Sequence, residues 1–327
     1  MSASTYAIEE NPLAGRDFLR MMDLAPDEYE WFLDAAIAEK ALYKANPAEA
    51  QSKAPYVGRA VGIILEKPSL RTRVSFERAV HRLGAQAIVM SDTSSAFSRG
   101  ESEKDTMMVM ERYVDAIVIR SFAQQRVEEL AKWASIPVVN ALTDDFHPCQ
   151  GLADFMTIKE EFDQLQGRKL AYLGDGANNM AHTYLEAGAL SGMHVVIASP
   201  ASYQPNLRYL AETRQLASAT GALLEVTESP IEALVDADVV VTDAWASMGF
   251  EAEHEKRAHA FVLYQVTSDS LKLAKPEAIF LHCLPAHRGE EVTNEVMDAS
   301  YSRIYDEAEN RMHAQQTLLR LLMAEKV

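Results

Sequence analysis

The alternation of short apolar runs with amphipathic segments constrains the fold of this 327-residue chain more than any other feature of its sequence. Apolar runs of strand length stand at residues 58–65, 86–91, 115–121 and 137–142, and then at 169–174, 194–200, 223–228, 238–244 and 278–284. Segments with helical periodicity separate these runs. Apolar strands that alternate with helices are typical of parallel sheets covered by helices on both faces. The pattern therefore predicts an α/β protein with two doubly wound parallel-sheet domains.

The two series of strands are separated by the stretch 143–150, which we expect to join the two domains. A further helix is expected at residues 26–44, before the first series, and another from about residue 307 to 323, after the second. A chain of 327 residues with 48% hydrophobic content is too long for one small core, which agrees with two domains.

Charge and cysteine usage limit the possible partners and the compartment. The formal net charge of −17 provides no global positive field, so neither a nucleic acid nor a membrane surface is expected as a partner. Cys149 and Cys283 are the only cysteines and lie far apart in sequence, so no disulfide framework is expected. The first residues lack a basic region and an apolar run, and no stretch reaches the roughly 18 apolar residues of a membrane span. We therefore expect a cytoplasmic protein.

Polar residues follow the predicted strands where an open α/β sheet binds its ligands, outside the carboxyl ends of the strands. Ser69, Arg71 and Thr72 come after the first strand and open a helix. Two hydroxyls, a guanidinium and the unpaired amides of a helix N-terminus suit an anion. The alternative is an ordinary helix cap with solvated arginines.

Two further strand ends favour the anion site. Arg120 stands at the end of the third strand, and His147 and Gln150 follow the fourth. A lone histidine is more often structural than ligand-binding, but the position of His147 after a strand favours function. The first domain thus offers donors for a phosphate at three strand ends.

The second domain places different chemistry at the same positions. The segment "GDGANNMAHT" (174–183) carries Asn178 and Asn179, and "TDAWASMG" (242–249) carries Asp243, Ser247 and Met248; "HCLPAHRG" (282–289) follows the last strand. A carboxylate, amides and exposed backbone groups suit a zwitterionic amino acid, with Asp243 for its ammonium group and Asn179 for its carboxylate.

A dinucleotide site and a metal site are the alternatives in this domain. "GDGANN" lacks the third glycine of a dinucleotide fingerprint, and no acidic residue ends the next strand, so binding of NAD is disfavoured. Metal ligation is disfavoured because His282 and Cys283 lack partners at a useful spacing, while His254 and His259 lie in a charged segment that we expect to be exposed.

Several motifs together carry a family resemblance that covers about residues 60 to 316. They are "SLRTR", "RGESEKDT", "FHPCQGLAD", "GDGANNMAH", "DAWASMG", "HCLPAHRGEEVT" and "DEAENRMHAQ". In this order they resemble the carbamoyltransferases, and among these the ornithine carbamoyltransferases. The resemblance implies transfer of the carbamoyl group of carbamoyl phosphate to the δ-amine of L-ornithine, which gives L-citrulline and phosphate in arginine biosynthesis. It also implies an active site in the cleft between the domains and a cytoplasmic homotrimer, or a multiple of trimers.

The resemblance also implies roles for individual residues. The phosphate of carbamoyl phosphate would be bound by Ser69, the Leu70 amide, Arg71, Thr72 and Arg120. The rest of that substrate would contact His147, Gln150, Cys283, the Leu284 carbonyl and Arg311. The ornithine site would comprise Asn179, Asp243, Ser247 and Met248. Since Arg311 would reach carbamoyl phosphate, the C-terminal helix 308–327 would pack back on a carbamoyl phosphate domain of residues 1–146, leaving 147–307 as the ornithine domain.

The chemistry agrees with this assignment without a metal or an organic cofactor. Attack on the carbamoyl carbon needs a neutral amine, although an ornithine δ-ammonium has a pKa near 10. Asp243 and Cys283 are the candidates for positioning the amine and accepting its proton. Arg120 and His147, with the Thr72 hydroxyl, can stabilise negative charge on the carbonyl oxygen.

Two positions depart from the family pattern. Leu70 replaces the first threonine of the usual S-T-R-T-R, and Phe97 stands where Gln or His reaches a neighbouring subunit's active site. Aspartate as the acceptor is disfavoured by "SMG" and "HCLP", whereas putrescine and N-acetylornithine are disfavoured by "DAWASMG". A putrescine or other amine carbamoyltransferase and a non-catalytic homologue are kept as alternatives, together with an NAD-dependent oxidoreductase.

Overall fold

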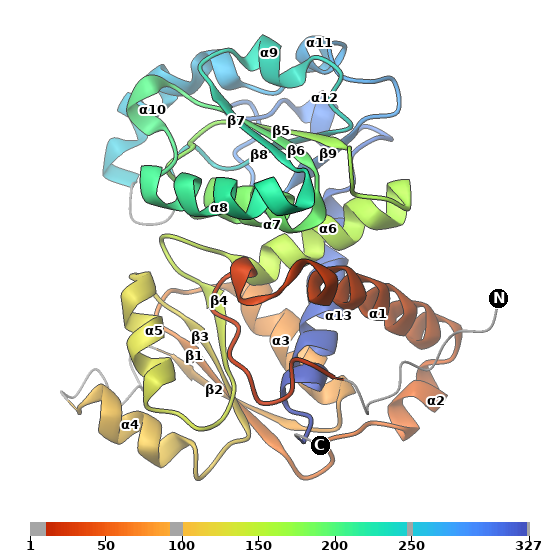
Figure 1. Cartoon of the computed structure of the whole chain (residues 1–327), viewed down its shortest axis with the longest axis vertical. Helices are drawn as coiled ribbons and strands as arrows, with labels where there is room; N and C mark the ends of the chain where they lie inside the picture. Colours follow the sequence, from red (N-terminus) through yellow and green to blue (C-terminus); the bar gives the residue numbers. More distant parts are fainter. Residues whose placement is uncertain (1–10, 92–100, 247–250, 326–327) are drawn as a thin grey trace. The chain divides into compact units, whose positions relative to one another are not determined.

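The computed structural model describes residues 11–91, 101–246 and 251–325, and each predicted strand is present with bounds that differ by a few residues. The chain forms two compact units. Unit 1 comprises the residues up to Met156 and those from Asn310 onward, and unit 2 comprises Thr157–Glu309. Each unit has a parallel sheet with helices on its faces, as Figure 1 shows, so the predicted fold class is confirmed.

Unit 1 contains a four-stranded parallel sheet with the order β2-β1-β3-β4. The strands are β1 Ala60–Leu65, β2 Gln86–Ser91, β3 Ala116–Arg120 and β4 Val138–Leu142. Every residue of β3 is buried, as expected for a strand covered on both faces. The chain runs from β1 to one edge and then returns to the other side of β1, so the switch point of this sheet lies between β1 and β3. Leu65 and Arg120 are paired there at the carboxyl ends.

Unit 1 takes its helices from both the N-terminal and the C-terminal part of the chain. They are η2 Met21–Asp23, α1 Pro26–Ala45, α2 Pro47–Ser52, α3 Leu70–Arg82, α4 Glu103–Met110, α5 Gln124–Lys132, the start of α6 Pro148–Phe162 and the end of α13 Ile304–Leu322. The last helix packs on α1, where Glu39 binds Thr317 (2.9 Å) and Arg320, and Lys40 donates to Asn310 (2.7 Å).

The boundary between the units lies within α6 rather than in the predicted linker at 143–150. The first turns of α6 stay with unit 1 because they contact it closely. The Cys149 thiol donates to the Asn140 carbonyl of β4 (3.4 Å), and the Phe155 ring lies 6.1 Å from the Tyr29 ring of α1.

Unit 2 contains a five-stranded parallel sheet with the order β7-β6-β5-β8-β9. The strands are β5 Lys169–Leu173, β6 His194–Ala198, β7 Leu223–Thr227, β8 Val239–Thr242 and β9 Ile279–His282. Besides the end of α6 and the start of α13, the helices are α7 Asn179–Ser191, η5 Ala201–Tyr203, α8 Leu207–Thr220, α9 Pro230–Leu234, η6 Glu251–Glu253, α10 His254–Phe261, η7 Val262–Tyr264, α11 Ser268–Leu271 and α12 Asn294–Met297. In Figure 1, α7 and α8 cover one face of this sheet and α9 the other. The switch point lies between β5 and β8.

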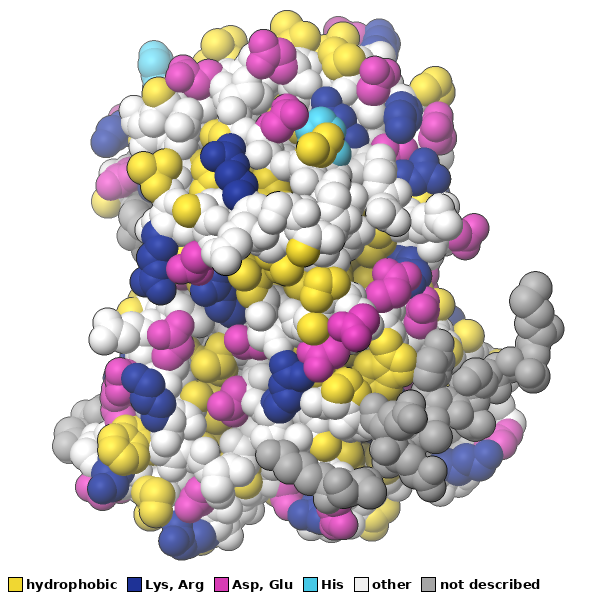
Figure 2. Space-filling model, viewed as in Figure 1, with side chains coloured by type: hydrophobic (Ala, Val, Ile, Leu, Met, Phe, Trp, Pro, Cys, Tyr) yellow, Lys and Arg dark blue, Asp and Glu magenta, His cyan; other side chains and the backbone are white. Residues whose placement is uncertain are grey.

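The surface carries both signs of charge. Figure 2 shows Lys and Arg side chains interspersed with Asp and Glu on the face in view. None of the helices in the described part of the chain has the length and apolarity that a membrane span requires.

Candidate functional site

The carboxyl ends of β1 and β3 carry the predicted anion site of unit 1. Ser69 caps α3, because its Oγ accepts the Thr72 backbone N–H (3.2 Å). The Ser69 hydroxyl also donates to Thr72 Oγ1 (3.0 Å), which accepts a second bond from Arg311 Nη2 (3.0 Å). Thr72 is fully buried. Arg311 of the C-terminal helix is therefore held at the N-terminus of α3.

Three guanidinium groups act on one buried histidine next to this cap. Burial lowers the pKa of His147 well below 6.5, and the positive charges of Arg311, Arg120 and Arg71 lower it further. His147 is therefore neutral at pH 7. Arg120 and Arg311 are themselves buried, and the buried Arg71 Nε has no hydrogen-bond partner among the described residues. Cations held together in a buried region are unfavourable unless an anion joins them, so this cluster is suited to a phosphate.

The remaining predicted residues of unit 1 differ in their environments. Gln150 is buried near His147 on α6 and donates from Nε2 to Asp154 (2.7 Å). The Leu70 side chain is 76% exposed, so only its backbone can take part in the anion site of this chain. Arg73 forms an exposed ion pair with Glu77 (2.9 Å).

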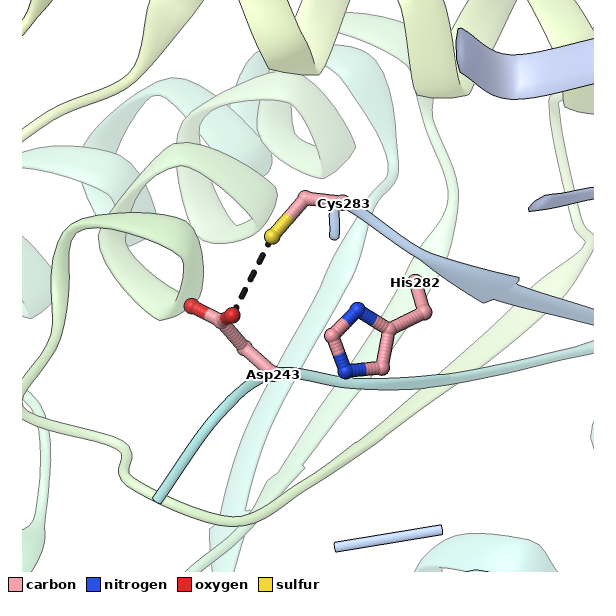
Figure 3. Close-up of side chains that lie close together, drawn as sticks. All are labelled: Asp243, His282 and Cys283. Carbon is pink, nitrogen blue, oxygen red and sulfur yellow. Dashed lines mark hydrogen bonds between the residues drawn. The ribbon is translucent and has the colours of Figure 1, made fainter. Parts of the chain in front are cut away.

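In unit 2 the ends of β8 and β9 bring Asp243 and Cys283 together (Figure 3). The Cys283 thiol donates to Asp243 Oδ1 at 3.1 Å. Burial raises the pKa of Asp243 above its usual 3.8, although His282 and Cys283 act in the opposite direction. A carboxylate with a raised pKa is a better proton acceptor for an amine than an ordinary aspartate.

Asn178 is a contact of Asp243 that the sequence reasoning missed. Its Oδ1 caps α7 by accepting the Ala181 N–H (2.9 Å), and its Nδ2 donates to Asp243 Oδ2 (3.1 Å). One side chain thus links the loop after β5 to the end of β8, across the switch point of the sheet. Asn179, the predicted ligand, is the next residue and opens α7. The N-cap position of Asn178 is the signal that could have revealed this role.

His282 and Glu291 form a hydrogen-bonded pair next to Cys283 and Leu284. Neither was predicted as a site residue. The Leu284 N–H donates to His282 Nδ1 (2.9 Å), so the proton of this imidazole is on Nε2, which donates to Glu291 Oε1 (3.0 Å). Both side chains are fully buried. Leu284 has a φ of 58°, a strained conformation for a leucine, and the Leu284–Pro285 peptide is cis. The buried pair holds this unusual backbone in place.

A buried arginine of α10 contacts both the loop after β5 and the described residues after β8. Arg257 binds Asp175 at 2.6 Å and donates to the Trp245 carbonyl at 3.1 Å. Ser247 and Met248 lie outside the described residues, as does Phe97.

The glycines of "GDGANN" serve the packing of the loop. A Cβ at Gly176 would lie 2.7 Å from Ser199 Oγ and 2.8 Å from the Tyr203 carbonyl oxygen. Neighbouring protein atoms therefore already occupy the space beside Gly176. In a dinucleotide-binding loop, a glycine lets the backbone come close to the pyrophosphate. Here Gly176 instead lets the backbone come close to Ser199 and Tyr203 of the same protein, which disfavours such a loop.

The ligand atoms of Asp243, His282 and Cys283 also lie within 4.8 Å of one another, although both nitrogens of His282 already form hydrogen bonds. The sequence reasoning overlooked this grouping because Asp243 is far from the other two in the chain.

Comparisons with known proteins give a match for each of the two parts of the chain. Residues 16–160 match the family model described as "Aspartate/ornithine carbamoyltransferase, carbamoyl-P binding domain", and residues 166–322 match "Aspartate/ornithine carbamoyltransferase, Asp/Orn binding domain". The chain is 49% identical to the ornithine carbamoyltransferase of Symbiobacterium thermophilum over 312 residues, 95% of this chain and 99% of that protein. It is 46% identical to that of Oceanobacillus iheyensis over 327 residues, 99% and 100% of the two chains.

The chain is also similar to solved structures of ornithine carbamoyltransferases. The ornithine carbamoyltransferase of Pyrococcus furiosus superposes with a TM-score of 0.90 at 44% identity, and 95% of this chain and 98% of that chain are covered. The ornithine transcarbamoylase of Giardia lamblia gives a TM-score of 0.85 at 32% identity, with 96% and 99% covered.

Proposed function

Since this chain belongs to the aspartate/ornithine carbamoyltransferase family, we propose that it transfers the carbamoyl group of carbamoyl phosphate to the δ-amine of L-ornithine, which gives L-citrulline and phosphate. The observation that carries the proposal is the convergence of Arg71, Arg120 and Arg311 on the buried His147. Two buried arginines and a third, partly buried one around the same histidine suit an anionic substrate, in a chain whose net charge is −17.

Unit 1 binds carbamoyl phosphate in this proposal. Its phosphate accepts hydrogen bonds from the Ser69 and Thr72 hydroxyls, the Leu70 amide, and the guanidiniums of Arg71 and Arg120. The Arg311 guanidinium, which donates a hydrogen bond to Thr72, adds a third positive charge to this site. Because His147 is neutral, it can donate one hydrogen bond to the carbamoyl oxygen without competing for the phosphate charge. Gln150 contacts the carbamoyl amide.

Unit 2 binds ornithine. Asp243 attracts the δ-ammonium, while Asn179, Ser247 and Met248 contact the amino-acid end. Cys283 and the Leu284 carbonyl lie where the amine reacts, and the His282–Glu291 pair positions them.

The reaction follows from these positions. Asp243 accepts the proton of the δ-ammonium, and the neutral nitrogen attacks the carbamoyl carbon. Negative charge develops on the carbonyl oxygen, where Arg120 and His147 stabilise it. The bond from carbon to the bridging oxygen then breaks, and phosphate leaves with the electron pair, takes up the second proton of the attacking nitrogen and remains bound to the arginines. Orientation and fixed charges supply the acceleration, so the residues of both units are required.

The assembly and the cellular role are further parts of the proposal. Helix α3 exposes Leu70 (76%) and Val74 (55%), one turn apart on the same side. Such an apolar face is suited to contact with other copies of the chain, which supports a homotrimer or a multiple of trimers. We expect the enzyme to act in the cytoplasm in arginine biosynthesis.

The test is citrulline formation by the purified chain with carbamoyl phosphate and, in parallel, ornithine, putrescine, N-acetylornithine or aspartate. Clear preference for ornithine supports the proposal. Preference for putrescine would leave the anion site intact and refute the amino-acid site, and no reaction with any acceptor would indicate a non-catalytic homologue.

A further inference from the structure

The loop after β9 holds a second group of ionisable side chains, most of which the proposed reaction does not use. One ligand atom from each of His287, Glu290 and Glu291 lies within 4.8 Å of the other two. His254, the first residue of α10, joins them, with its Nε2 3.1 Å and 3.0 Å from the two carboxylate oxygens of Glu290. We call these four residues the His–Glu cluster. It lies entirely within unit 2.

Two spacings at Glu290 match metal coordination, and the ligand atoms of His287, Glu290 and Glu291 lie within 4.8 Å of one another, while His254 approaches this group through Glu290. Four ligands of a tetrahedral zinc ion, each at about 2.1 Å, lie about 3.4 Å apart. Glu290 Oε2 is 3.0 Å from His254 Nε2 and 3.8 Å from His287 Nδ1, which brackets that value. The two rings are 6.5 Å apart at 67°, so they are not stacked face to face. Two imidazole nitrogens therefore approach the same carboxylate.

Glu291 supplies an independent indication of a cation. Its side chain is fully buried. Oε1 accepts bonds from His282 Nε2 (3.0 Å) and from the His287 backbone N–H (2.6 Å), whereas the buried Oε2 has no hydrogen-bond partner among the described residues. A buried carboxylate oxygen without a partner is costly, and a metal ion would compensate its charge.

The nearby arginine does not supply this charge. Arg288 is directed to Asp298, which it binds through two bonds of 2.7 and 2.8 Å, and to Asn294 at 3.2 Å. The two neighbouring carboxylates at positions 290 and 291 form no ion pair with Lys or Arg in the described part of the chain.

We propose that the His–Glu cluster binds one divalent transition ion of the Zn²⁺ class, with ligands from His254, His287, Glu290 and Glu291. Two imidazoles select Zn²⁺, Ni²⁺ or Co²⁺ over Mg²⁺ and Ca²⁺, which prefer oxygen ligands. His254 and His287 are 45% and 44% exposed in their side chains, so an ion can enter from solvent. The ion links the start of α10 to the loop after β9 and stabilises the native state of unit 2.

The experiment uses the full chain after treatment with a chelator. Co²⁺ is added while visible absorption is recorded, and Zn²⁺ binding is measured by calorimetry together with Tm. We expect one ion per chain, a Co²⁺ spectrum of nitrogen and oxygen ligation, and a rise in Tm with Zn²⁺ concentration. His254→Ala and His287→Ala should each weaken binding at least tenfold.

Two variants serve as controls. His259→Ala removes another exposed histidine of α10 and should bind like the wild type. Cys283→Ser removes the sulfur of the Asp243, His282 and Cys283 group and should leave the affinity of the His–Glu cluster unchanged. The proposal is overturned if His254→Ala and His287→Ala bind as tightly as the wild type. It is equally overturned if Cys283→Ser abolishes binding and Co²⁺ gives a thiolate charge-transfer band, because the ion is then on Cys283. Circular dichroism of the metal-free variants verifies that each is folded.

Discussion

Arg311 provides a direct test of the anion site, since it is the one predicted ligand that comes from the far end of the chain. It is 3% exposed and donates to Thr72 Oγ1 at 3.0 Å. Among the charged neighbours that depress the pKa of His147, its effect is the largest. Arg311→Met removes the charge and keeps most of the aliphatic volume, so packing on α13 should be retained.

Two magnitudes follow from this substitution. Loss of a desolvated, charge-assisted contact to phosphate costs about 2–5 kcal/mol. At about 1.4 kcal/mol for each tenfold, the KM for carbamoyl phosphate should rise roughly 30-fold to several thousandfold. In the free enzyme the pKa of His147 should rise because one of three repulsive charges is lost. It should still lie below 6.5, because burial remains the principal cause of the shift.

The assays are steady-state citrulline formation at varied carbamoyl phosphate and NMR titration of the imidazole protons, assigned with His147→Asn. Arg73→Met is the matched control: it removes an arginine from the same motif, but Arg73 is exposed and paired with Glu77, so little change in KM is expected. A wild-type KM together with an unchanged His147 titration would show that Arg311 is no part of the site.

Three further predictions address the other residues. Asp243→Asn should lower kcat by at least about 100-fold because the proton acceptor is lost, while calorimetry should find carbamoyl phosphate binding unchanged; equal loss of both would indicate a folding defect. Glu291→Gln replaces the charged acceptor of the buried His282 Nε2–H, so the free energy of unfolding should fall by about 1.5–3 kcal/mol in urea titrations, and wild-type stability would refute the pairing. His147 has a lowered pKa in the folded state, so its unfolded form takes up a proton first; the free energy of unfolding should therefore decrease as pH falls below about 6.5 toward the folded pKa. Urea unfolding at two pH values should show this decrease in the wild type and a smaller one in His147→Asn, and identical pH dependence would contradict it.

Much of the fold could be predicted from the sequence. The strands β1 to β9 are short, apolar and bounded by turns, so their positions follow from local pattern. The order of the strands within each sheet does not follow from local pattern. Whether β3 returns to the free side of β1 is decided by helix packing over whole domains, and this choice sets the Arg120 side chain beside the residues that follow β1. The place where the chain divides, inside α6, likewise depends on the Phe155–Tyr29 contact and not on a linker composition.

The residues of the candidate site likewise fall into those predicted from the sequence and those that only the structure revealed. Ser69, Arg71, Thr72 and Asp243 were predicted because each stands at or after the end of a strand and carries a polar or charged group, whereas Cys283 was predicted from the family resemblance. Their supports were missed: Asn178 on Asp243, Glu291 beneath His282, and Arg257 on Asp175. These partners are ordinary polar residues in sequence, and only their burial against one another gives them a role.

The His–Glu cluster is the clearest case of what tertiary structure alone decided. His254 in sequence is one histidine of a charged, exposed segment, and this pattern argued against a metal. Folding places it 3.0 Å from Glu290, a residue that no local period connects to it. The sequence by itself determined the strands, the charged groups at their ends and the class of substrate, because these depend on neighbours in the chain. The tertiary structure decided which groups share a proton, a charge or a ligand, because those interactions act over a few ångströms between residues that the sequence keeps far apart.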